Sequence, residues 1–137
     1  MPEMVEKAPG NVSLLGSLDR PSVAALYGQC RLFVLCSTCF EGFPLALVEA
    51  MVHGKAVIAP RIGGIPEIVD DGDTGLLFTP GDAEELAEKI RYLWDRPGLC
   101  RQLGQAGRDK ALREYSPEKY YERLMSVYEE ALSLIHI

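Results

Sequence analysis

The chain has 137 residues, enough for one domain, and its 47% apolar and 25% charged residues are typical of a globular protein rather than a disordered one. Its net charge of −6 disfavours general nucleic-acid binding, which requires a basic surface. The sequence contains neither a leader-type segment nor an apolar run of the roughly 20 residues that a membrane span needs, so we expect neither.

The first segment, residues 1–11, is polar, contains proline and glycine, and is expected to be a lead-in to a domain over 12–131. The apolar run Val12–Leu15 predicts a buried strand. Pro21 then opens a predicted helix that ends at Gly28.

Three further apolar runs, at Leu32–Leu35, Ala56–Ala59 and Gly75–Phe78, predict strands that are covered on both faces, because polar residues do not alternate within them. Helices are expected between and after these strands, over 44–54, 82–96, up to 114, and from 117 onward. The predicted strand Gly75–Phe78 is followed by Asp82 and Glu85 at the spacing of a capping box. This alternation predicts an α/β fold with an open parallel sheet and helices on its faces.

The four cysteines, Cys30, Cys36, Cys39 and Cys100, do not have the spacing of a zinc site, and we expect no metal. Cys36 and Cys39 form one C-x-x-C pair, which can be interpreted as a redox pair. Their apolar surroundings favour buried, reduced thiols instead. We therefore expect a reducing compartment, the cytoplasm.

Glu41 and Glu49 are predicted to lie beyond the carboxyl end of a strand, where open parallel sheets bind ligands. Glu41 precedes the predicted helix and Glu49 lies about a turn and a half inside it. The free N–H groups of Leu45 and Ala46 favour a phosphate, and a carboxylate can accept from both hydroxyls of a diol. Together these groups fit a nucleotide sugar; the alternative is two solvated glutamates near a helix start.

Two other loops follow predicted strands. Gly63 and Gly64 allow a backbone to come close to a ligand, and Pro66 can then open a helical turn. The alternative is a tight turn without a ligand. The loop Gly16-Ser17-Leu18 follows the first predicted strand and carries little information by itself.

Four blocks in order, Glu41–Met51, Gly63–Val69, Asp71–Leu77 and Pro80–Asp82, resemble the E-x(7)-E signature and the following motifs of the retaining glycosyltransferases of family four, the "group 1" transferases. The resemblance implies part of the C-terminal half of a GT-B fold, a Rossmann-like domain that binds the donor. It implies transfer of a hexose from a nucleotide diphosphate sugar to an acceptor that the sequence does not identify.

In that family the matching residues each contact a different part of the donor. By resemblance, Glu41 is the catalytic-site carboxylate that contacts hydroxyls of the donor hexose, and the amides of Gly42 and Phe43 lie against the same sugar. The amides of Leu45 and Ala46 hold the diphosphate.

The remaining matched positions address the nucleoside. Glu49 accepts from the ribose hydroxyls, and Gly16, Ser17 and Leu18 lie near the base. Pro44 departs from the glycine that many relatives have, which removes one N–H from the phosphate site.

The resemblance also implies parts that this sequence does not include. The family's diphosphate-neutralising Arg and Lys precede its first Glu, and Lys7, Lys55 and Arg61 are not at matching positions. The N-terminal acceptor domain is expected as a partner, and no cofactor beyond the donor is expected. We therefore expect this chain alone to be inactive, with peripheral membrane contact left open for the full-length enzyme.

Two alternative functions remain: a nucleotide-sugar-binding module without chemistry, and a sugar-nucleotide epimerase. The epimerase is disfavoured because Glu41 and Glu49 occur with the full surrounding blocks. The tail Leu132–Ile137 is interpreted either as a last helical turn or as a non-native end, because a common sequencing-library adaptor encodes the same residues in one frame.

Overall fold

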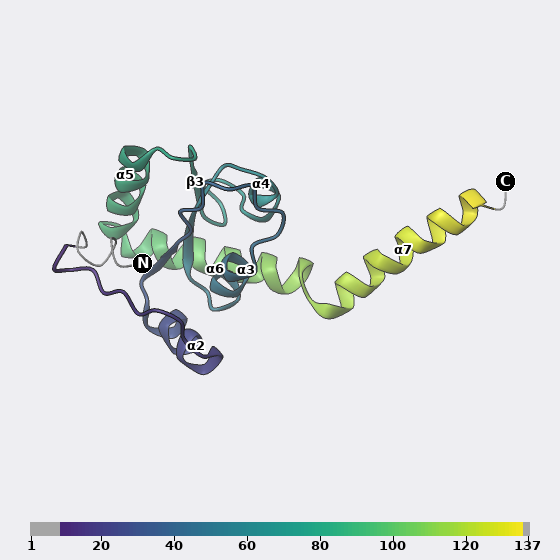
Figure 1. Cartoon of the computed structure of the whole chain (residues 1–137), viewed down its shortest axis with the longest axis horizontal. Coiled ribbons are helices and arrows are strands. Elements are labelled where there is room, and N and C mark those ends of the chain that lie inside the picture. The colour runs from purple at the N-terminus through teal and green to yellow at the C-terminus, as the bar shows by residue number, and fades with distance from the viewer. Residues whose placement is uncertain (1–8, 136–137) are drawn as a thin grey trace.

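The computed structural model describes residues 9–135 (Figure 1). Within them, β1 (Leu32–Val34), β2 (Ala56–Pro60) and β3 (Leu76–Phe78) form a sheet in the order β1-β2-β3. Both pairings are parallel, with Phe33 opposite Val57 in the first and Ala59 opposite Leu77 in the second. The predicted parallel α/β sheet is confirmed.

One described helix precedes these strands, and the others lie between and after them. They are α2 (Arg20–Gln29), α3 (Leu45–Val52), α4 (Ile65–Ile68), α5 (Ala83–Trp94), α6 (Pro97–Glu114) and α7 (Pro117–Ile135). The start of α5 matches the predicted cap, because the Asp82 carboxylate accepts from the Glu85 N–H at 2.9 Å. The Glu85 carboxylate, however, accepts from the N–H of Thr79 at 2.8 Å, which secures the loop after β3.

Helices cover both faces of the sheet. Because successive strand residues point to opposite faces, each strand contributes side chains to two core clusters. One core cluster joins one side of the strands to α3, α4 and the end of α6, and includes Val57, Ala59, Leu77, Leu47 and Met51. The other joins the opposite side to α5 and the start of α6, and includes Ala56, Ile58, Phe78, Leu93 and Leu103. The central strand β2 is consequently buried along its whole length.

The strand predicted at Val12–Leu15 is wrong. These residues are exposed and outside any strand, with Leu15 55% exposed. A strand needs a neighbouring strand for its backbone hydrogen bonds. Among the described residues no strand pairs with Val12–Leu15, since β1 pairs with β2 alone. Without such a neighbour, the apolar run takes an irregular path over the surface.

Helix α6 connects the two faces of the sheet by crossing its amino end. Gly104 lies against the carbonyl of Gly54, just before β2, and a Cβ atom there would collide with it. Gly107 lies close to the carbonyl of Thr74, just before β3. From there the helix continues along the first face as far as Tyr115.

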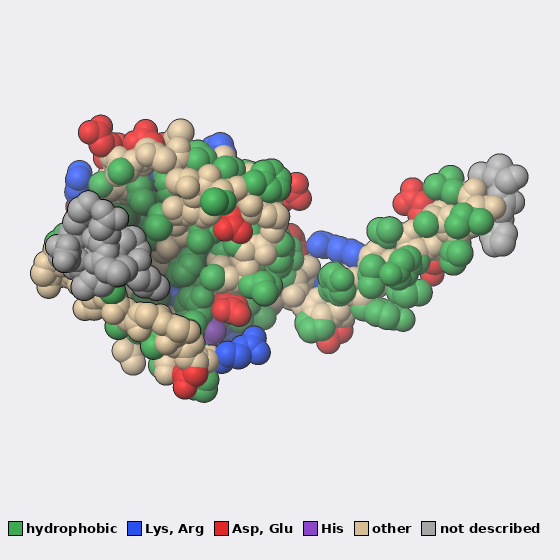
Figure 2. All heavy atoms as spheres, viewed as in Figure 1, with side chains coloured by type: hydrophobic (Ala, Val, Ile, Leu, Met, Phe, Trp, Pro, Cys, Tyr) green, Lys and Arg blue, Asp and Glu red, His purple; other side chains and the backbone are tan. Residues whose placement is uncertain are grey.

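Helix α7 projects away from the rest of the chain (Figure 1), and none of its residues is buried. Hydrophobic side chains cover much of the α7 surface seen in Figure 2. Exposed members are Tyr120, Tyr121, Val127, Tyr128, Leu132, Leu134 and Ile135. Leu132–Ile135 form its last turn, and His136 and Ile137 lie outside the described residues. Among residues 9–135, no helix combines the length and apolar character that crossing a membrane requires.

Two glycines of α6 predict opposite effects of the same substitution. Gly104→Ala should destabilise the fold by about 1–3 kcal/mol, because the new methyl group meets the Gly54 backbone. Gly98→Ala is the matched control: a Cβ atom there meets nothing within 4 Å, so helix propensity should stabilise the fold by up to about 1 kcal/mol. Urea unfolding followed by Trp94 fluorescence measures both. Equal effects would contradict the close crossing.

Candidate functional site

Three loops leave the carboxyl ends of the strands, and the first of them, together with α3 and the loop before α2, forms the candidate site. They run from β1 to α3, from β2 to α4, and from β3 to α5. In open parallel sheets this end is where ligands bind, because helices start there with free N–H groups.

The loop between β1 and α3 is held by a crossing of two backbones. The N–H of Gly64 donates to the carbonyl of Glu41 at 2.8 Å. A Cβ atom at Gly63 would collide with the backbone of Glu41, and one at Gly64 with that of Gly42. The glycine pair was expected to let a backbone approach a ligand; in the structure it lets the two loops approach each other.

The Glu41 side chain is partly buried and is oriented by its own loop. The Ser37 hydroxyl donates to the Glu41 carboxylate at 3.0 Å. The same hydroxyl oxygen accepts from the Cys39 N–H at 3.3 Å, which folds the loop back on itself. Glu41 is thus fixed through both its carbonyl and its carboxylate.

The start of α3 presents two N–H groups without a cap. Pro44 is the N-cap residue, with an extended backbone and no side-chain hydrogen bond to the helix. The first N–H groups of a helix have no acceptor within it, so those of Leu45 and Ala46 depend on solvent or a ligand. Both residues are exposed. The positive end of the helix dipole favours an anion at this point.

Glu49 lines a hollow of about 360 Å³ between α2, α3 and the loop before α2. Leu18 lines the same hollow, so the structure brings together two residues predicted from separate loops. Gly16 and Ser17 do not line it, although Gly16 adopts a left-handed φ of 66° that turns the chain before Leu18. The other lining residues are Arg20, Val23, Ala24, Tyr27 and His53.

Tyr27 connects this hollow to the start of α3. Its side chain is buried, its ring stacks on His53 at 5.1 Å, and its hydroxyl donates to the Ala46 carbonyl at 3.1 Å. Burial raises the pKa of the Tyr27 hydroxyl, and the neighbouring Glu49 charge raises it further. The hydroxyl therefore stays protonated and remains a donor at neutral pH. The sequence indicated Tyr27 only as part of an apolar helix face.

Phe43 does not line the hollow of Glu49. Its ring is 48% exposed and forms part of a second hollow of about 460 Å³, beside Tyr115, Tyr120 and Arg123. Of the predicted sugar-contacting loop Glu41–Phe43, only Phe43 lines a hollow, and that hollow is separate from the one that Glu49 lines.

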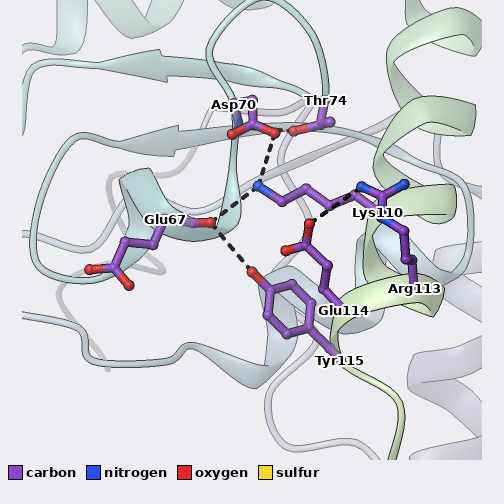
Figure 3. Close-up of polar contacts among 7 residues, drawn as sticks. All are labelled: Glu67, Asp70, Thr74, Lys110, Arg113, Glu114 and Tyr115. Atoms are coloured by element: carbon purple, nitrogen blue, oxygen red, sulfur yellow. Dashed lines mark hydrogen bonds and ion pairs between the residues drawn. The ribbon is translucent and has the colours of Figure 1, made fainter. Parts of the chain in front are cut away.

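A buried lysine, which the sequence did not reveal, supports this part of the fold. The Lys110 ammonium, on α6, donates to the Asp70 carboxylate at 2.9 Å and to the Glu67 carbonyl at 3.1 Å (Figure 3). Only 6% of Lys110 is exposed, so these partners replace its hydration. A lysine on a mixed-charge helix is normally solvated, and the one sequence signal was its small neighbours Gly107 and Ala111.

Two of the cations near the loops are engaged in structural contacts. Arg61 pairs with Asp71 at 2.8 Å, and the Lys55 ammonium donates to the Gly28 carbonyl at 3.1 Å. Lys7 lies outside the described residues. Among residues 9–135, no group of three or more His, Cys, Asp or Glu side chains could hold a metal ion.

The four cysteines are free thiols, but the prediction that Cys36 and Cys39 are buried is wrong. Cys100 is buried and Cys30 is half-buried, whereas Cys36 and Cys39 are exposed. The last two were assigned to an apolar interior. In the structure β1 ends at Val34, and the chain then runs along the surface.

The comparisons with known proteins agree with one family. The family model described as "Glycosyl transferases group 1" matches residues 5–110. The MMP alpha-(1->4)-mannosyltransferase of Mycolicibacterium hassiacum is 35% identical over 119 residues, which cover 86% of this chain and 29% of that protein. The chain thus spans about a third of the length of the curated relatives it matches.

Solved structures agree as well. The sucrose-phosphate synthase of Thermosynechococcus elongatus aligns with a TM-score of 0.83 at 30% identity, over 97% of this chain and 33% of that one. Anabaena HepE, in complex with UDP-glucose, aligns with a TM-score of 0.74 at 28% identity, over 81% of this chain and 30% of that one.

Burial predicts two classes of thiol. Cys36 and Cys39 should react rapidly with DTNB in the native chain. Burial raises the pKa of the Cys30 and Cys100 thiols, which lowers their thiolate fraction, so both should react slowly. All four should react once the chain is denatured without reductant. Cys36→Ser should remove one fast equivalent, and a Cys36–Cys39 disulfide in freshly lysed cells would contradict the prediction.

Proposed function

This chain belongs to the group 1 glycosyltransferase family, and from that we propose that it forms the donor-binding part of a retaining enzyme that transfers a hexose from a nucleotide diphosphate sugar. One observation carries the proposal: along the chain, one carboxylate, Glu41, precedes the uncapped start of α3 and another, Glu49, follows it within the helix. Carboxylates accept hydrogen bonds from sugar hydroxyls, and helix N–H groups bind phosphate.

In the proposed arrangement the nucleoside occupies the hollow of Glu49. The Glu49 carboxylate accepts from the ribose hydroxyls, and the loop Gly16-Ser17-Leu18 contacts the base through Leu18. The shared hollow of Leu18 and Glu49 supports this part of the proposal, as does the UDP-glucose held by HepE. Tyr27 keeps the first turn of α3 in place beneath the ligand.

The phosphates and the sugar follow along the same line. The N–H groups of Leu45 and Ala46 receive the diphosphate, and Glu41, with the amides of Gly42 and Phe43, contacts the hexose. Positive charge develops at the anomeric carbon in the transition state, so contacts from the Glu41 carboxylate can strengthen there. We propose no metal and no cofactor other than the donor substrate.

Catalysis is proposed to need more than this chain. A departing diphosphate requires cationic groups, and Arg61 and Lys55 are occupied by Asp71 and the Gly28 carbonyl. The family's diphosphate-neutralising Arg and Lys, which precede its first Glu at the start of the donor-binding domain, and the separate N-terminal acceptor domain would complete the enzyme. Its proposed location is the cytoplasm, with any membrane contact peripheral and made by the full-length enzyme.

The purified chain should bind UDP weakly and transfer no sugar. Titration calorimetry should detect saturable UDP binding, and inorganic diphosphate should bind less tightly because it leaves the hollow of Leu18 and Glu49 empty. An assay for UDP release from UDP-glucose should find no turnover. Turnover by the chain alone would refute the proposed division of labour, whereas UDP binding no tighter than that of inorganic diphosphate would refute the nucleoside site.

Substitution of the two glutamates should affect the binding of different ligands. Glu49→Gln should weaken UDP binding by roughly 1–3 kcal/mol, the scale of a charged hydrogen bond. Glu41→Gln should leave UDP binding nearly unchanged but lower the affinity for UDP-glucose. Glu88→Gln, an exposed position on α5, is the control and should change neither. Equal losses of UDP affinity at both site glutamates, or none at Glu49, would show that the ligand lies elsewhere.

A further inference from the structure

Phe43 contacts an aromatic residue from the far end of the domain. Its ring meets the ring of Tyr115 nearly edge-on, with centroids 5.2 Å apart and planes at 71°. Tyr115 is the C-cap residue of α6, immediately before the chain turns into α7. The contact therefore links the loop Glu41–Phe43 to the junction between the last two helices.

Tyr115 is itself firmly held. Its N–H donates to the Ala111 carbonyl at 2.9 Å, and its hydroxyl reaches the Glu67 carbonyl at 3.4 Å. The buried Lys110 donates to that same carbonyl, as Figure 3 shows. Burial raises the pKa of the Tyr115 hydroxyl, so it remains a donor at neutral pH.

Helix α4 joins the two supports of the loop. At its start, Gly64 donates to the carbonyl of Glu41; near its end, Glu67 accepts from Tyr115. The loop is therefore fixed at Glu41 by the beginning of α4, and at Phe43 by a ring anchored to the end of the same helix. Between these two points lies Gly42, for which an added Cβ atom would meet nothing within 4 Å.

We propose that Tyr115 is a positioning residue for the donor loop: its ring holds Phe43 and thereby fixes the Glu41–Phe43 backbone. The consequence for the sugar rests on the function proposed above. Because this loop faces the hexose and not the nucleoside, loss of the Tyr115 ring should lower the affinity for UDP-glucose while sparing UDP. An aromatic pair of this kind corresponds to a change of about 3- to 10-fold.

Hydrogen exchange followed by mass spectrometry tests the positioning role without a ligand. In Tyr115→Ala, a peptide covering Ser37–Phe43 should exchange faster than in the native chain, while α5 should be unchanged. Tyr115→Phe keeps the ring and should restore slow exchange. Tyr120→Ala, which removes another ring from the wall of the same hollow, should have no effect on the loop. If α5 also exchanges faster, Phe43→Leu, made at a half-exposed position, replaces Tyr115→Ala. Faster exchange of the loop alone would then support the ring contact, and unchanged exchange of the loop would overturn it.

Titration with UDP and UDP-glucose tests the consequence for the sugar. Tyr115→Ala should weaken UDP-glucose about 3- to 10-fold and change UDP by less than twofold, and Tyr115→Phe should bind both normally. Equal weakening of both ligands would indicate a merely structural role and overturn the proposal, as would unchanged loop exchange. If the native chain binds neither ligand, the proposed function fails, while hydrogen exchange still decides the role of Tyr115.

Discussion

The geometry of the candidate site depends on one steric constraint, the contact of two backbones at the carboxyl end of the sheet. Glu41 and Gly42 lie so close to Gly63 and Gly64 that no side chain fits between them. Because Gly64 is the N-cap of α4 and α4 follows β2, this contact ties the first loop to the most buried of the described strands. The position of the Glu41 backbone is therefore fixed by residues that directly follow that strand.

Patterns set by local chemistry were predictable from sequence. The run Ala56–Ala59 is continuously apolar because β2 is central and covered on both faces, and that burial leaves a clear trace in composition. Asp82 caps α5 through a hydrogen bond within its own turn. The positions of Glu41 before α3 and of Glu49 within it were also predictable, because where a helix starts depends on residues nearby in the chain. Their roles toward a donor stay predictions.

Features set by partners distant in the chain were not predictable. Val12–Leu15 has a strand-like composition, but a strand also requires a neighbour, which composition does not report. Cys36 belongs to an apolar run that ends on the surface: Leu35 still packs against the core, and the next residue, Cys36, is exposed. Lys110 is buried because α6 packs against α3 and β2, which brings its ammonium to Glu67 and Asp70, and the same packing brings Tyr115 to Phe43. Only the packing of α6 brings these residues together.

The exposure of α7 has a thermodynamic consequence. None of its residues is buried, so its helical state draws little support from the core and depends on its own sequence. In proteins most helical stability comes from tertiary packing rather than from intrinsic propensity. We therefore expect the body to unfold in one cooperative transition and α7 to melt gradually at lower temperature. A helical signal averaged over the whole chain would broaden the transition, whereas a probe within the body would report its sharp midpoint.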